Sequence, residues 1–160
     1  MSSQWQTLIN AQELSALLDS NDKVVVFDCR HTLTAPEAGK EAWTQAHIPG
    51  AYYAHLDTDQ ASPIIEGVSG RHPLPDRAQL AQWLGERGVE SGVQVVAYDD
   101  AGGAIAARLW WMLRWLGHHD VAVLNGGVQA WNALDLPMNN VVPAMQPANF
   151  IAQDSDFVAL

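Results

Sequence analysis

The chain has 160 residues and a formal net charge of −10, with 8 Lys and Arg against 18 Asp and Glu. That charge repels nucleic acid and anionic membrane surfaces, and no cluster of basic side chains offsets the repulsion. No apolar run approaches the length of a membrane span, and the first residues lack the basic start and apolar core of a signal peptide. A single cysteine, Cys29, excludes an internal disulfide. We therefore expect a one-domain protein of the cytoplasm.

The first half of the chain alternates short apolar runs with helical patterns. Strands are expected at residues 7–9, 24–27 and 52–53. The second of these is apolar throughout, as in a strand buried on both faces. Asn10 and Glu13 have the spacing of a capping box, which predicts that a helix begins there. A short helix is expected over residues 41–46, in the region between the second and third strands.

A long irregular segment, residues 58–75, separates the two halves, and loops of that length are usually functional or disordered. Further strands are expected at 93–98 and 121–124. Helices are expected from Asp76 to about Gly88, over 104–116, and after Gly127. The helix over 104–116 is apolar nearly all round, so something besides the sheet must cover it. Strands alternating with helices predict an α/β fold, in which helices flank both faces of a mostly parallel, five-stranded sheet.

The loop that follows the central strand, 93–98, is the main candidate for a functional site. That loop consists of Asp99, Asp100, Ala101, Gly102, Gly103 and Ala104. A tight turn between a strand and a helix gathers free backbone N–H groups at the helix start, where negative charge is stabilised. We expect the carboxylate of Asp99 to occupy this cradle and to accept N–H groups from residues 100–104. The glycine spacing is not that of a dinucleotide-binding fingerprint.

Several motifs, in this order, resemble the rhodanese (sulfurtransferase) family. They are His47-Ile48-Pro49-Gly50-Ala51 four residues after Trp43, Arg71-His72-Pro73-Leu74-Pro75, the run from Ala107 to Arg114, and Leu124-Asn125-Gly126-Gly127 with Trp131. The similarity is greatest to the N-terminal, non-catalytic domain of tandem-domain thiosulfate and 3-mercaptopyruvate sulfurtransferases. The resemblance implies a rhodanese-like fold over residues 1–150. It also implies that residues 136–160 are a linker toward a second rhodanese domain absent from this chain.

In that family the catalytic cysteine follows the central strand of the C-terminal domain, and here Asp99 stands at the nucleophile position. A carboxylate cannot carry a sulfane sulfur, so the resemblance implies a degenerate active loop over 99–104 and no catalytic residue in this chain. The implied partners are the second domain of the same protein, a small sulfur donor such as thiosulfate or 3-mercaptopyruvate, and an acceptor such as cyanide or a thiol. We expect no cofactor and no metal site. The alternative is a free-standing inactive module that binds a partner or an anion, and a cysteine-bearing second repeat beyond Leu160 would distinguish the two.

Three further residues are open to two interpretations each. The resemblance implies that Asp57 and His72 reach across the domain interface and assist proton transfer. The alternative is that Asp57 caps a turn and that His72 hydrogen-bonds its own loop. Cys29 follows a strand at the edge where α/β sites form and could be a second sulfur carrier. We favour a small packed residue for Cys29, because its loop lacks the glycine nest.

Overall fold

The computed structural model describes residues 5–61 and 73–153. In these residues five strands form one sheet in the order β1-β5-β4-β2-β3. The strands are β1 (Leu8–Ile9), β2 (Val24–Asp28), β3 (Tyr52–Tyr53), β4 (Gln94–Tyr98) and β5 (Val121–Leu124). Every neighbouring pair is parallel, so the predicted sheet is confirmed and is parallel throughout rather than mostly so. All strands therefore place their carboxyl ends at one edge.

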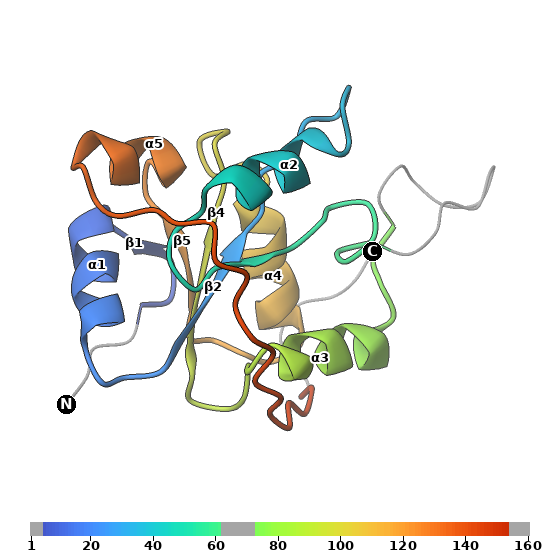
Figure 1. Cartoon of the computed structure of the whole chain (residues 1–160). Helices are drawn as coiled ribbons and strands as arrows, with labels where there is room; N and C mark the ends of the chain where they lie inside the picture. Colours follow the sequence, from blue (N-terminus) through green and yellow to red (C-terminus); the bar gives the residue numbers. More distant parts are fainter. Residues whose placement is uncertain (1–4, 62–72, 154–160) are drawn as a thin grey trace.

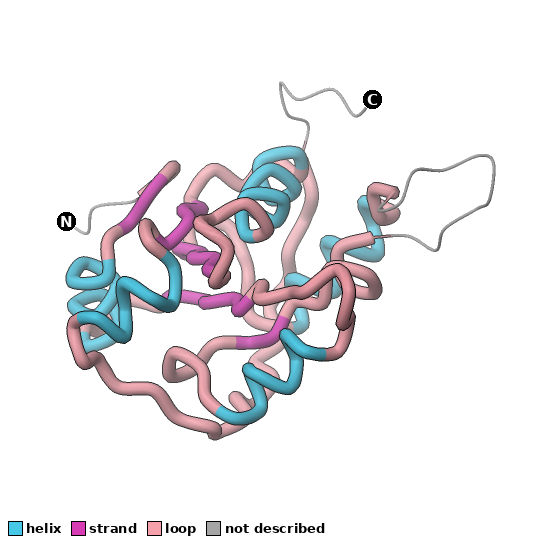
Figure 2. Tube along the Cα trace, turned by 90° about the horizontal axis from the view of Figure 1, so that it is seen from above, coloured by secondary structure: helices cyan, strands magenta, loops and turns pink. Residues whose placement is uncertain are grey.

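Helices cover both faces of this sheet, as Figures 1 and 2 show. They are α1 (Ala11–Asp19), α2 (Ala38–Gln45), α3 (Arg77–Glu86), α4 (Ala106–Trp115) and α5 (Gly127–Ala133). Alternate residues of β2 and β4 face α3 and α4 on one side, and the residues between them face α1 and α5 on the other. Both sets are apolar, which explains the unbroken apolar runs of the sequence. None of the described helices is long and apolar enough to cross a bilayer.

Helix starts follow the capping signals where the sequence carries them. Asn10 and Glu13 form both hydrogen bonds of the predicted capping box. Asp76 caps α3 by accepting the backbone N–H of Gln79 at 3.0 Å. Helix α4 begins at Ala106 rather than Ala104, because residues 101–105 turn tightly around the carboxylate of Asp99. Helix α2 begins three residues before its predicted start and has no side-chain cap.

The tryptophans of α4 are covered largely within this domain. Trp115 is buried, and the guanidinium of Arg77 lies over its ring at 4.9 Å. Trp111 stacks on Trp115, and the indole N–H of Trp110 donates to the carbonyl of Gln6 at 2.9 Å. The expected second cover is therefore supplied by α3 and by the N-terminal segment, while Trp110 and Trp111 keep partial exposure.

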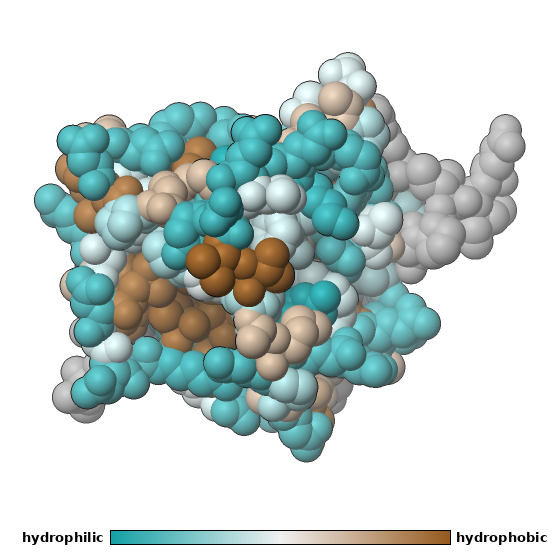
Figure 3. All heavy atoms as spheres, in the orientation of Figure 1, coloured by the Kyte–Doolittle hydropathy of each residue, from teal (hydrophilic) through white to brown (hydrophobic). Residues whose placement is uncertain are grey.

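Residues 136–153 form an irregular strap that crosses the domain (the red-orange segment in Figure 1). The strap pairs with His47 through Asn139, and it accepts the hydroxyl of Tyr52 at the carbonyl of Ala144. Near its end, Gln153 donates to the carbonyl of Leu116. Figure 3 shows apolar atoms gathered on the face that the strap crosses, and Val141 and Val142 are more than 60% exposed. A segment with the composition of a linker thus makes specific contacts with the domain.

Candidate functional site

Asp99 lies at the carboxyl end of β4, the middle strand of the sheet, and is fully buried. Its Oδ1 accepts the backbone N–H groups of Ala101 and Gly103, each at 2.9 Å. Its Oδ2 accepts those of Ile105 at 2.9 Å and Ala106 at 2.8 Å. The predicted anion cradle is therefore confirmed in its geometry, and its donors extend beyond residue 104 into the first turn of α4.

Glycines give this loop its shape. Gly102 and Gly103 have φ angles of +71° and +93°, a region that L-residues with side chains rarely adopt. From the next loop, Gly127 approaches so closely that an added Cβ would lie 2.3 Å from the carbonyl oxygen of Asp99. That carbonyl accepts the N–H of Val128 at 3.0 Å. Sequence reasoning assigned Gly127 to a turn only, although the loop of α5 also holds the Asp99 loop in place.

The loop after β4 holds a negative charge, the carboxylate of Asp99. The four N–H groups that converge on the cradle all bond the carboxylate of Asp99 itself. Cys29, directly after β2, is fully buried, and burial raises the pKa of its thiol well above the usual value. The nearby charges of Asp28 and Asp99 raise that pKa further. A thiolate is therefore disfavoured at Cys29, in agreement with the packed-residue interpretation.

A buried polar network that the sequence analysis missed lies beside this loop. The carboxylate of Asp28 accepts Nη2 of Arg30 at 2.6 Å and the hydroxyl of Tyr98 at 2.9 Å. Burial raises the pKa of Asp28, while the charge and hydrogen bonds of Arg30 oppose that shift. Arg30 also donates to the carbonyl of Ala46, and Tyr98 accepts the N–H of Ile48. The network thus fixes the start of the His47–Ala51 motif against the strand ends.

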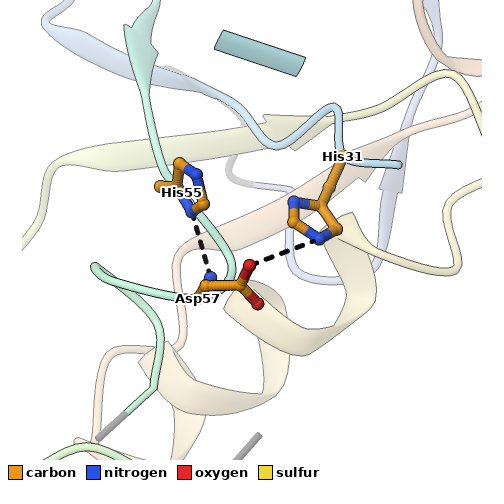
Figure 4. Close-up of side chains that lie close together, drawn as sticks. All are labelled: His31, His55 and Asp57. Carbon is orange, nitrogen blue, oxygen red and sulfur yellow. Dashed lines mark hydrogen bonds and ion pairs between the residues drawn. The ribbon is translucent and has the colours of Figure 1, made fainter. Parts of the chain in front are cut away.

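A second polar cluster follows β2 and β3 at the same edge of the sheet. Figure 4 shows His31, His55 and Asp57 facing one another, and their ligand atoms all lie within 4.8 Å. The Nε2 atom of His31 is 3.9 Å from Oδ2 of Asp57. His31 and His55 were not selected from the sequence, because they are far apart in the chain. One feature of the sequence could have predicted their proximity. His31 and His55 each follow a predicted strand, and neighbouring parallel strands place their carboxyl ends at the same edge of the sheet.

Asp57 follows β3 and is partly exposed. The turn after β3 is capped by Asp59, whose Oδ2 accepts the N–H of His55 at 2.8 Å. Asp57 instead keeps about a third of its side chain exposed. His72 lies outside the described residues, so its pairing with Asp57 stays a prediction.

A cavity whose lining does not include Asp99 opens beside the strap. It has a volume of about 470 Å³ and is bounded by α2, β3 and the strap. Its lining includes Trp43, Tyr52, Tyr53, His55, Arg87 and Met145. The composition is aromatic and mixed in charge, and His55 is shared with the cluster of Figure 4.

The comparisons with known proteins agree with this geometry. The model of the rhodanese-like domain matches residues 10–134. A probable 3-mercaptopyruvate sulfurtransferase of Pseudomonas aeruginosa is 46% identical over 147 residues, which cover 91% of this chain and 51% of that protein. A putative thiosulfate sulfurtransferase of Mycobacterium tuberculosis is 38% identical and is covered to 46%, with 83% of this chain aligned.

Solved structures point the same way. The 3-mercaptopyruvate sulfurtransferase from Leishmania major superposes with a TM-score of 0.79 at 31% identity, over 95% of this chain and 40% of that one. The chain spans about half the length of the curated relatives it matches. The family model matches most of the chain, and the parallel sheet and the glycine-containing loop after β4 agree with that match. This chain belongs to the rhodanese family.

Proposed function

We propose that this chain is the non-catalytic half of a sulfurtransferase. The whole protein moves sulfane sulfur from thiosulfate or 3-mercaptopyruvate to an acceptor such as cyanide or a thiol. A second rhodanese domain of the same protein supplies the catalytic cysteine, and residues 136–160 lead toward it. The observation that carries this proposal is the carboxylate of Asp99, held by four backbone N–H groups at the loop that follows the central strand.

The chemistry of sulfur transfer explains why an aspartate at this position supports a non-catalytic role. A thiolate must attack the outer sulfur of thiosulfate and expel sulfite, or attack the sulfur of 3-mercaptopyruvate and expel the enolate of pyruvate, and it then holds the sulfur as a persulfide. Converging backbone N–H groups stabilise the thiolate. Asp99 accepts the same kind of hydrogen bonds, so the loop keeps its shape. Its oxygen atoms cannot form the persulfide. The other candidate, Cys29, is buried and disfavoured as a thiolate.

Asp57 is the residue of this chain that we assign to the shared cleft. It lies at the carboxyl edge of the sheet, where sites of α/β proteins form, and part of its carboxylate faces solvent. With His72 it would assist proton transfer to or from the substrate held by the second domain. Neither residue acts without the thiolate of that domain.

Activity assays on the 160-residue chain test the proposal. With thiosulfate and cyanide, or with 3-mercaptopyruvate and a thiol, we expect no thiocyanate and no sulfide above the buffer control. Turnover that persists in the purified chain and disappears with Cys29→Ser would overturn the proposal and make Cys29 the nucleophile. Asp22→Asn is the control, because Asp22 is exposed and has no role in the proposed site.

The gene supplies an independent test. We expect the reading frame to continue past the codon for Leu160 into a second repeat that carries a cysteine after its central strand. A frame that stops there would contradict the tandem arrangement and favour the binding-module alternative.

A further inference from the structure

We propose that His31, His55 and Asp57 form a binding site for a divalent cation of the zinc class. The three residues come from two different strand ends, and the fold alone brings them together. Two imidazoles and one carboxylate form a donor set that suits zinc and its first-row neighbours, whereas calcium and magnesium prefer oxygen ligands alone.

The three ligand atoms lie within 4.8 Å of one another, so small side-chain rotations would bring them to a common ion. Nε2 of His31 and Oδ2 of Asp57 are 3.9 Å apart, which is too long for a direct hydrogen bond. Two ligands held about 2.0–2.1 Å from a tetrahedral zinc ion lie about 3.4 Å apart. The side chain of His31 is only 1% exposed, so packing holds its ring, while the side chain of Asp57 is 36% exposed.

The hydrogen bonds of His55 set the tautomer that ligation requires. The backbone N–H of Asp57 points at Nδ1 of His55 at 3.1 Å, and because an N–H can only donate, Nδ1 presents a lone pair. In the neutral ring the proton then resides on Nε2, which lies 3.3 Å from Oε1 of Glu37. A metal that displaces the N–H of Asp57 finds the Nδ1 lone pair in place. Glu37 then orients the ring from behind, as carboxylates do for many metal-bound histidines.

The site also has an open side. His31 and His55 are buried, but Asp57 keeps about a third of its side chain exposed. Three protein ligands would leave the fourth position of a tetrahedral ion for a water or an exogenous ligand. The proposal does not depend on Asp99 or on a second domain, and its test measures binding rather than sulfur transfer.

Cobalt is the probe for the first experiment, because it enters zinc sites and has visible absorption that reports coordination. We expect the untagged chain, first stripped with a chelator, to bind one equivalent of Co²⁺ and to develop the intense bands of a four- or five-coordinate ion. One equivalent of Zn²⁺ should abolish these bands, and millimolar Mg²⁺ should leave them unchanged. Absence of saturable binding at one equivalent would overturn the proposal.

Variants then locate the site. His31→Ala, His55→Ala and Asp57→Asn should each weaken Co²⁺ binding at least about tenfold. His119→Ala is the matched control, since His119 is exposed and lies outside the cluster, and its affinity should equal that of the parent chain. Affinities unchanged in His31→Ala and His55→Ala would contradict the assignment.

Nuclear magnetic resonance of the native chain keeps the test independent of variant folding. On addition of Zn²⁺, the imidazole resonances of His31 and His55 should shift in proportion to occupancy up to one equivalent. Those of His47, His118 and His119 should remain in place. Shifts confined to His119, or spread evenly over all histidines, would indicate surface binding and contradict the proposed site.

Discussion

At the scale of single residues, Asp99 shows how one side chain can satisfy a whole loop. Its two oxygens accept four backbone N–H groups, two from the glycine-rich turn and two from the start of α4. Buried N–H groups left without an acceptor destabilise a fold, so the side chain is structural as well as diagnostic.

Asp99→Ala should therefore lower the free energy of unfolding by about 1–3 kcal/mol, since it leaves buried N–H donors without partners. Urea denaturation of the 160-residue chain measures the change. Asp100→Ala is the control, because Asp100 is exposed and its carboxylate lies outside the cradle. Equal stabilities of the two variants would show that water replaces the carboxylate without penalty.

Asp99→Cys asks the complementary question. It places a thiol against the same N–H groups, which should lower the pKa of that thiol below that of a free cysteine. The rate of alkylation as a function of pH measures it. A pKa at or above about 8.5, the ordinary thiol value, would show that the cradle does not stabilise a thiolate.

His118 provides a pH-dependent prediction at the same scale. The ring is buried, its Nε2 donates to the carbonyl of Val93 at 2.8 Å, and burial lowers its pKa from the ordinary value. The unfolded chain then binds a proton at a pH where the folded chain does not. Stability from His118 is complete above about pH 6.5 and declines as pH falls below it, by at most about 1.4 kcal/mol per pH unit.

Urea denaturation at about pH 7.5 and about pH 5.5 measures this decline. The parent chain should lose more stability on acidification than His118→Gln, which cannot take up the proton. His119→Gln should behave as the parent chain, because His119 is exposed. Parallel pH profiles for the parent and His118→Gln would contradict the assignment.

At the scale of elements, the sequence predicted the features that depend on neighbouring residues, namely helix caps and buried strands. The capping box at Asn10 and the cap at Asp76 were predicted from residue type and spacing, and both form. The buried strands were predicted from apolar runs. The start of α4 was misplaced by two residues, because the backbone there bonds to Asp99 instead of continuing the helix. Such competition between a side chain and a helix turn is not visible in periodicity.

Gly127 links two elements and gives an element-scale prediction. Gly127→Ala should lower the free energy of unfolding by about 1–3 kcal/mol more than backbone strain alone would, because the new Cβ would clash with the carbonyl oxygen of Asp99. Gly92→Ala is the matched control, since Gly92 also has a positive φ of +86° but no heavy atom within 4 Å of an added Cβ. The difference between the two variants in urea denaturation isolates the contact. Equal losses would show that strain alone governs both positions.

At the scale of the whole molecule, the sequence could not predict which distant residues would meet. His31 and His55 follow different strands, and only the parallel pairing of β2 with β3 places them at one edge. The network of Asp28, Arg30 and Tyr98 depends on the register of β2 with β4 in the same way. The alternation of strands and helices in the sequence predicted a parallel sheet. The order in which the strands pair became known only from the structure.

The strap was also predicted only in composition. Its Pro and Asn content indicated a linker, and its structure is irregular, yet it contacts the domain along much of its length. Asn139 pairs with His47, and Ala148 donates to Gly85 at 2.7 Å. Phe150 packs on the core cluster and meets the ring of His118 edge-on, with ring centroids 5.7 Å apart. The strap is thus part of the fold of this domain.

Truncation after Leu136 should therefore destabilise the domain. The shorter chain loses these hydrogen bonds, each worth about 0.5–1.5 kcal/mol net, together with the apolar contact of Phe150. We expect a loss of at least about 3 kcal/mol in the free energy of unfolding, measured by urea denaturation. Phe150→Ala in the full chain should give an intermediate loss, because the hydrogen bonds remain. If the truncated chain unfolds as the parent does, the strap is a passive linker and its contacts contribute no net stability.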